Sequence, residues 1–201
     1  VVVGLGPAGL FAALLLARSG FRPLVLERGP ELDERVKAVE HFEKTGELNL
    51  NANIQFGEGG AGTFSDGKLT TRVGDPLCAF VTDAFLQHGA PADIAWRQKP
   101  HVGTDLLRGI IRSIRQEIIA LGGEVRFYTA LTGLKIENGA LAGIETTAGD
   151  FACQQLILAV GHSARDTFAM LHGLGLPLEC KPFSVGFRAE HLQTEIDKSL
   201  Y

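Results

Sequence analysis

The first residues of the chain have the types and spacing of a turn that binds a pyrophosphate. Three apolar residues, 1–3, precede the pattern Gly-x-Gly-x-x-Gly, and a long apolar stretch follows it. A strand that turns through this pattern into a helix presents backbone N–H groups and the positive end of the helix dipole to an anion. Gly4 then allows the tight turn, Gly6 the approach of the anion, and Gly9 the close packing of the helix. Pro7 suits the first turn, because its missing N–H costs nothing there.

An acidic residue ends the next predicted strand. Residues 23–27 are apolar up to Glu27, which follows Gly9 by 18 positions. At this distance a carboxylate accepts hydrogen bonds from both hydroxyls of an adenosine ribose. It also repels a 2′-phosphate. The pattern therefore predicts a dinucleotide site that prefers FAD or NAD to NADP.

Glycines cluster again in residues 47–75, a stretch with neither helical nor strand periodicity. Apolar residues within it, Phe56 and Leu69 among them, favour an ordered functional loop over a flexible linker. We expect Gly60 and Gly62 to have backbone conformations or close contacts that a β-branched residue cannot accept.

Composition excludes several classes of protein. The 201 residues include 19 Lys and Arg against 23 Asp and Glu, a net charge of −4, so nucleic acid is not an expected partner. With 45% apolar and 21% charged residues the chain can bury a full core, which excludes intrinsic disorder. The uncharged N-terminal stretch before Arg18 lacks a basic region and is broken by glycines, so no membrane anchor is expected.

The three cysteines, Cys78, Cys153 and Cys180, are too far apart for zinc-ligand or CxxC spacing. Their odd number argues against a disulfide framework, and reduced thiols predict a cytoplasmic protein. No metal site and no Ser-His-Asp arrangement is readable. The missing CxxC also speaks against a disulfide reductase.

Helical periodicity is clear in four stretches. The first helix runs to about Ser19 and ends at Gly20, and a surface helix from Glu31 ends at Gly46. A third spans 77–87. The fourth has Thr104 as its N-cap and an apolar face formed by Leu107, Ile110, Ile111, Ile114, Ile118 and Leu121. The basic stripe Arg108, Arg112 and Arg115 on that helix is interpreted as a solvated face.

The remaining strands form two patterns. Residues 125–128 are a short strand, and tight turns at 138–139 and 149–150 predict a three-stranded meander. Residues 156–160 form a continuous apolar run, typical of a strand covered on both faces. A further strand is expected within 182–190.

A three-stranded meander before an apolar strand that ends in glycine resembles the glutathione-reductase-type family of FAD-binding folds. The resemblance implies an α/β, Rossmann-like FAD/NAD(P)-binding fold with a parallel sheet and the meander inserted into it. An incomplete FAD-binding domain would occupy residues 1–165, and residues 166–201 would begin a second, substrate or cap domain. Ordinary Rossmann dehydrogenases continue with further βα units, which the sequence lacks, so FAD is favoured over NAD.

Four motifs narrow the resemblance: residues 59–69, 99–105, 161–167 and 181–186. Together they resemble the bacterial NAD(P)/FAD-dependent oxidoreductases, also described as FAD-dependent dehydrogenases. The similarity runs over nearly the whole chain and departs at Leu192, where a proline is expected.

Site residues follow from this resemblance. It adds Ala8 to the pyrophosphate turn, places Arg28 beside the adenine, and brings the backbone of Leu131 to the adenine ring. Gly161 would approach from the sheet. The loop that would pass close to the pyrophosphate and flavin contains Gly59, Gly60, Ala61, Gly62 and Thr63.

The sequence points to catalytic residues less specifically than to cofactor-binding residues. Lys68 and Asp66 follow the glycine loop and are candidates for a position beside the flavin. A cation there, such as Lys68, stabilises the reduced ring. His101 and His162 are candidate proton donors, with His101 preferred. The adjacent residues 165 and 166 are interpreted as a charged pair at a helix N-terminus and nothing more.

The expected function is that of a FAD-dependent oxidoreductase that transfers hydride or electrons through non-covalently bound flavin. NAD(P)H is a candidate electron donor, and the substrate is expected to be an unidentified small molecule. Alternatives are a flavin-binding module that acts on a macromolecule such as tRNA, and an NAD-binding regulatory domain. The resemblance implies a C-terminal segment that returns to the FAD domain. Without it, residues 1–201 are expected to bind ADP-like ligands better than FAD, to show no turnover, and to leave Phe183, Val185 and Phe187 exposed.

Overall fold

A four-stranded parallel sheet in the order β3, β2, β1, β7 forms the centre of the structure. The computed structural model describes residues 1–65, 67–69, 71, 73–97, 99–187 and 189–200. Val2 in β1 is in register with Val25 of β2 on one side and Ile157 of β7 on the other. The strands are β1 (Val2–Val3), β2 (Leu24–Leu26), β3 (Glu124–Arg126) and β7 (Ile157–Leu158).

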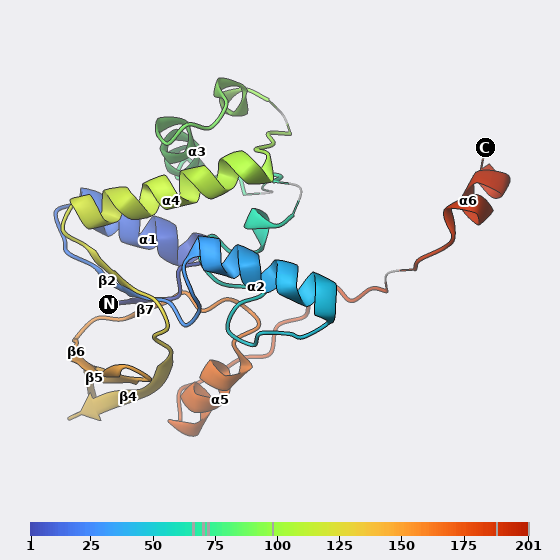
Figure 1. Cartoon of the computed structure of the whole chain (residues 1–201). Helices are drawn as coiled ribbons and strands as arrows, with labels where there is room; N and C mark the ends of the chain where they lie inside the picture. Colours follow the sequence, from blue (N-terminus) through green and yellow to red (C-terminus); the bar gives the residue numbers. More distant parts are fainter. Residues whose placement is uncertain (66, 70, 72, 98, 188, 201) are drawn as a thin grey trace.

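Helices cover one face of this sheet, where α1 and α4 lie side by side and α3 packs against them (Figure 1). The predicted apolar face of α4 is confirmed from Leu107 to Ile118, but Leu121 lies beyond the helix and is exposed. Gly103, not Thr104, is the N-cap of α4, and no side chain in the described part of the chain caps this helix. The helices are α1 (Pro7–Arg18), α3 (Cys78–Gln87) and α4 (Thr104–Ala120).

The predicted three-stranded meander is confirmed, and it covers the opposite face of the parallel sheet. It packs Leu131 and Ile144 against Val3 and Leu26 of the parallel sheet. A two-residue turn at Asn138 and Gly139, both with positive φ, joins its first two strands. The second turn lies at residues 147–148, and not at 149–150 as predicted, because Gly149 and Asp150 already pair with β5. The strands are β4 (Leu131–Glu137), β5 (Ala140–Thr146) and β6 (Gly149–Ala152).

The prediction that residues 156–160 form a strand covered on both faces is wrong in part. β7 exists, but Ile157 is 41% and Leu158 39% exposed. Among the described residues only β1 pairs with β7, so β7 is an edge strand. Apolar content reveals that a residue favours burial, but it does not reveal whether a neighbour is present to cover it.

Outside these layers lie α2, the glycine-rich loop and the C-terminal helices. α2 (Leu32–Thr45) ends at Gly46, as predicted, and Gly46 has the left-handed conformation. The 3-10 turns are η1 (Ala61–Thr63) and η2 (Ala92–Ala95), and the last helices are α5 (Arg165–Gly173) and α6 (Gln193–Leu200). Among the described residues, no helix is both long and apolar enough to cross a bilayer.

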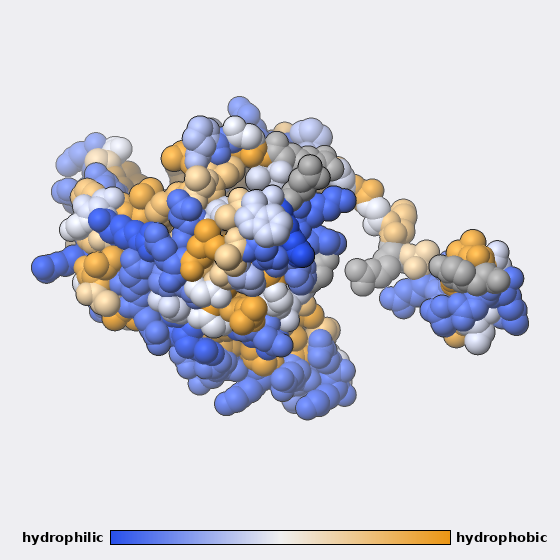
Figure 2. All heavy atoms as spheres, turned by 90° about the horizontal axis from the view of Figure 1, so that it is seen from above, coloured by the Kyte–Doolittle hydropathy of each residue, from blue (hydrophilic) through white to orange (hydrophobic). Residues whose placement is uncertain are grey.

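The chain after α5 runs to α6 as an arm that stands apart from the rest of the molecule (Figures 1 and 2). The strand expected within 182–190 is not formed in its described residues, 182–187 and 189–190. Phe183, Val185 and Phe187 are exposed, as expected. Alternating apolar residues favour a strand, but a strand needs a hydrogen-bonding neighbour, and the described residues place none beside this segment.

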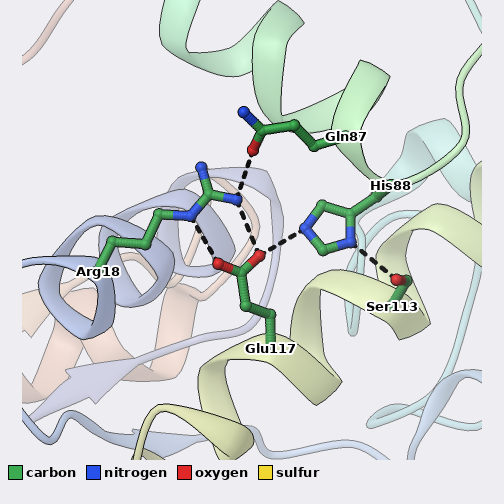
Figure 3. A network of polar contacts seen from close by, with 5 residues as sticks. All are labelled: Arg18, Gln87, His88, Ser113 and Glu117. Atoms are coloured by element: carbon green, nitrogen blue, oxygen red, sulfur yellow. Dashed lines mark hydrogen bonds and ion pairs between the residues drawn. The ribbon is translucent and has the colours of Figure 1, made fainter.

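One polar network joins the three helices above the sheet (Figure 3). The Glu117 carboxylate of α4 accepts hydrogen bonds from Nε and Nη2 of Arg18 in α1, at 2.7 and 2.8 Å. It also contacts Nε2 of His88 at 2.7 Å, and the other ring nitrogen of His88 lies 2.8 Å from the Ser113 hydroxyl. Arg18 donates a further bond to the side-chain oxygen of Gln87.

This network brings a serine, a histidine and a carboxylate together, which spacing in the sequence does not reveal. The bidentate arginine fixes the carboxylate, so the cluster ties α1, α3 and α4 together. The Arg18 hydrogen bond, supported by His88, lowers the pKa of the Glu117 carboxyl below its ordinary value. A lowered folded-state pKa means that this stabilisation is present above the unfolded pKa and is lost as pH falls through the folded value.

We therefore expect Glu117→Gln to lower the free energy of unfolding by about 1–2 kcal/mol at neutral pH. The difference from the unmodified chain should shrink as pH falls below the ordinary glutamate pKa. Urea unfolding across this pH range measures it, with Glu43→Gln, at an exposed position on α2, as the control. A pH-independent difference would contradict the assignment.

Candidate functional site

A cavity of about 490 Å³ opens where the parallel strands end. Its wall is built from the turn after β1, the end of β2, the glycine-rich loop, the segments that follow β3 and β7, and the start of α5. Ligands of open α/β sheets bind at the carboxyl ends of the strands. The lining residues predicted from sequence are Gly4, Gly6, Pro7, Ala8, Glu27, Arg28, Gly60, Ala61, Leu131 and Gly161.

The turn after β1 brings the N-terminus of α1 to this cavity. Gly4 has a φ of +97°, and a Cβ on Gly9 would lie 1.8 Å from the carbonyl oxygen of Gly4. Only glycine at position 9 lets the helix approach the turn this closely. No side chain among the described residues caps α1. The N–H groups of its first turn lack partners within the helix and remain available for an anion.

Glu27 stands at the end of β2 and is 3% exposed. Its Oε2 accepts a hydrogen bond from the N–H of Leu5 at 2.8 Å, and its Oε1 accepts one from Gly29 at 2.9 Å. The carboxylate therefore connects the end of β2 to the turn after β1, and these two hydrogen bonds fix it at the cavity wall. Each oxygen keeps a second lone pair for a ligand.

Arg28 also lines the cavity, but its guanidinium is held by α5. Nη1 contacts Oδ1 of Asp166 at 3.3 Å, and Nη2 contacts Oδ2. The interpretation of residues 165 and 166 as a helix-terminal pair and nothing more is therefore wrong for Asp166, which pairs across the fold with Arg28. This arginine lowers the pKa of the Asp166 carboxyl below its ordinary value.

The glycine-rich loop is organised by one arginine. Arg35 of α2 is fully buried and donates hydrogen bonds to the carbonyl oxygens of Asn53, Ile54, Glu58 and Gly60 and to Oγ1 of Thr63, all within 3.1 Å. Its guanidinium also lies 4.7 Å from the centre of the Phe64 ring. These contacts fix the loop between Asn53 and Phe64, which agrees with the prediction of an ordered loop.

Burial lowers the pKa of Arg35 to about 10, so the side chain stays charged at neutral pH. A charged group buried without partners would cost far more than folding can supply. The loop carbonyls and the Phe64 ring offset that cost, and in return the guanidinium satisfies carbonyls that the loop could not pair with itself.

A buried glutamate links the loop to two helices. Glu58 accepts a hydrogen bond from the N–H of Leu32, which caps the start of α2, and its Oε1 lies 2.8 Å from Nε of Arg115. Burial raises the pKa of the Glu58 carboxyl, and Arg115 opposes this shift.

The interpretation of the basic stripe on α4 as a solvated face is wrong. Arg115 pairs with Glu58 and Glu31, and Arg112 pairs with Asp33 of α2. Arg108 donates to the carbonyl oxygen of Thr63 at 3.2 Å. All three arginines are partly buried because the loop and α2 pack over this side of α4, which charge patterning alone does not show.

The two loop glycines differ. Gly60 lines the cavity with a φ of +70°, and a Cβ there would lie 2.5 Å from Cδ of Pro7. Gly62 lies inside the turn η1, where a Cβ would make only an ordinary contact, 3.7 Å from Leu107. The expectation of a special backbone conformation is confirmed for Gly60 and wrong for Gly62.

Several predicted site residues lie outside the cavity lining. Gly9, Gly59, Gly62 and Thr63 support the turn and the loop from behind it. Asp66 lies outside the described residues. Of the two candidate proton donors, only His162 lines the cavity.

Lys68 and His101 are direct neighbours in an isolated antiparallel bridge. The flanking bonds run from Leu69 to Pro100 and from Val102 to Gly67. Residues opposite each other in such a pair project to the same face. The structure thus brings the two catalytic candidates together, and neither lines the cavity.

Sequence reasoning missed Arg35, Glu58 and Asp166. For Arg35 a signal existed: Leu32, Arg35 and Val39 share one helical face, and all three are buried. An arginine on an apolar stripe indicates a buried partner. Glu58 and Asp166 gave no comparable signal, because their partners are distant in sequence.

No protein-family model matches the chain. An "uncharacterized protein" of Clostridium beijerinckii is 51% identical over 201 residues, which is all of this chain and 38% of that protein. A digeranylgeranylglycerophospholipid reductase of Methanocella arvoryzae is 26% identical over 98% of this chain and 46% of its own length. The chain thus spans less than half the length of these two relatives.

Among solved structures, the glycine oxidase from Bacillus cereus superposes with a TM-score of 0.51 at 14% identity, over 87% of this chain and 57% of that one. At this identity the similarity concerns the fold. Sheet order, meander and cavity define the class: the chain has the Rossmann-like FAD/NAD(P)-binding fold.

The Arg35 network yields a test of stability. Arg35→Lys should lower the free energy of unfolding by about 3 kcal/mol or more, because an ammonium cannot reach the same set of carbonyls and leaves several unpaired. Arg112→Lys, at a more exposed arginine, should change it by less than about 1 kcal/mol. Urea unfolding measures both. Equal effects would show that the buried guanidinium does not organise the loop.

Proposed function

We propose that this chain is the nucleotide-binding part of a FAD-dependent oxidoreductase that holds its flavin without a covalent bond. The observation that carries the proposal is the cavity at the strand ends, where the α1 N-terminus, a fixed carboxylate and a glycine-lined loop meet. These three groups suit the pyrophosphate, the ribose and the close passage of a dinucleotide, respectively.

Each part of the wall has its own task in this proposal. The N–H groups at the start of α1 hold the pyrophosphate, and Glu27, fixed by Leu5 and Gly29, accepts the ribose hydroxyls. The backbone from Thr129 to Leu131 meets the adenine, while Gly60 and Ala61 lie along the pyrophosphate. When bound, the flavin supplies the hydride and electron transfer.

Lys68 and His101 are the proposed cation and proton donor of the flavin side. Their support is that the bridge places them on one face, next to the glycine-rich loop. A lysine there stabilises negative charge on a reduced ring, and a histidine there is a candidate proton donor.

Two names among the comparisons agree with redox chemistry: a reductase by sequence and an oxidase by fold. We propose an unidentified small molecule as substrate, NAD(P)H as the electron donor and the cytoplasm as the location. The net charge of −4 supports a small-molecule site over a nucleic-acid surface.

The proposal is tested by the purified chain and by the full-length relative from Clostridium beijerinckii. The relative should show the visible absorption of bound flavin, and the chain should bind ADP in a calorimetric titration. A colourless relative that binds NAD instead would contradict the flavin assignment. A chain that does not bind ADP would contradict the site itself.

The loop glycines provide a matched pair of variants. Gly60→Ala should weaken ADP binding at least about tenfold, because the new methyl group meets Pro7 and alanine disfavours a positive φ. Gly62→Ala should leave ADP affinity within about twofold. Circular dichroism checks that both variants fold. Equal affinities would place the loop away from the ligand.

A further inference from the structure

The ribose end of the cavity contains two residues with opposite preferences. An acid at the position of Glu27 favours a free 2′-hydroxyl, whereas an arginine nearby is the usual partner of a 2′-phosphate. Glu27 and Arg28 are adjacent in sequence, and both line the cavity. Which of the two governs ligand choice depends on whether the guanidinium of Arg28 is available.

Asp166 makes Arg28 unavailable. The two side chains form a bidentate pair, the geometry in which an arginine binds a carboxylate most strongly. The same geometry is what a phosphate would need. The Arg28 side chain lines the cavity and is 25% exposed, whereas that of Asp166 lines the adjacent groove and is 57% exposed, so Asp166 holds the guanidinium from outside the cavity.

Asp166 is itself held in place. Its Oδ1 accepts a hydrogen bond from the N–H of Thr167 at 2.9 Å, and it stands in the first turn of α5, where the helix dipole favours a negative charge. Thr167 and Ala164, on either side of it, line the cavity. The carboxylate is thus anchored by α5 and reaches across to the end of β2.

Glu27 and Arg28, which line the cavity, carry opposite charges, and Arg165 and Asp166 line an adjacent groove that Arg28 also lines. A 2′-phosphate would therefore meet the carboxylate of Glu27 and, in Arg28, a guanidinium already paired with Asp166.

We propose that Asp166 is a specificity-determining residue that, by holding Arg28, makes the cavity select the unphosphorylated adenosine ribose of FAD or NAD and reject NADP. The inference rests on the proposed nucleotide-binding function. It assigns selectivity to two acids from separate elements, and not to Glu27 alone.

Calorimetric titrations with ADP and with 2′-phospho-ADP test this inference. The unmodified chain should prefer ADP by at least about tenfold. Asp166→Asn should keep ADP affinity within about threefold and raise the affinity for 2′-phospho-ADP about tenfold, because the released guanidinium can bind the phosphate.

Asp33→Asn is the matched control. Asp33 also stands in the first turn of a helix, pairs with an arginine of another element, and is 58% exposed, but it does not line the cavity. This variant should leave the preference between the two nucleotides unchanged.

A double variant separates the two ways in which Asp166 could act. In Arg28→Met/Asp166→Asn the gain for 2′-phospho-ADP should disappear. If the gain persists there, or if Asp166→Asn leaves the preference unchanged, the inference is overturned. If the unmodified chain binds neither nucleotide, the proposed function itself fails, which is a distinct outcome.

Discussion

The buried guanidinium of Arg35 is the interaction on which the site depends. A loop with glycines at 57, 59, 60 and 62 has little apolar side chain to hold it together, and its carbonyls would otherwise need water. Arg35 supplies donors to carbonyls at both ends of this loop, from Asn53 to Gly60. One rigid, planar, charged group thereby replaces the hydrophobic core that such a loop cannot form.

The fixed loop in turn fixes the cavity. Gly60 lies against Pro7, so the loop abuts the first turn of α1 with no room for a side chain between them. Glu58 connects the same loop to the start of α2 and, through Arg115, to α4. The wall on this side is therefore positioned by charges buried behind it, while the wall itself is mostly backbone, which suits the close approach of a pyrophosphate.

At the other end of the cavity, charged side chains and not glycine backbone form the wall. Glu27 is satisfied by backbone N–H groups, and Arg28 by the carboxylate of Asp166, so both charges at the ribose end are fixed before a ligand arrives. Fixed charges discriminate between ligands more sharply than mobile ones, because they do not rearrange to accommodate a misplaced phosphate. The cavity thus has glycine backbone along one wall and fixed charges at the other end.

The parallel sheet, the meander and the turn at Gly4 to Gly9 were predictable from the sequence, because they depend on local periodicity and on glycine spacing. The position of Glu27 at the end of β2 was predictable too, because its distance from the turn reflects the length of one helix and one strand. The burial of Arg35, the packing of the α4 arginines against α2 and the loop, the edge position of β7 and the pairing of Asp166 with Arg28 became visible only in the folded chain. Each of these depends on contacts between residues far apart in the chain, such as the 138 positions between Arg28 and Asp166, and such pairings leave no periodic trace in a single sequence.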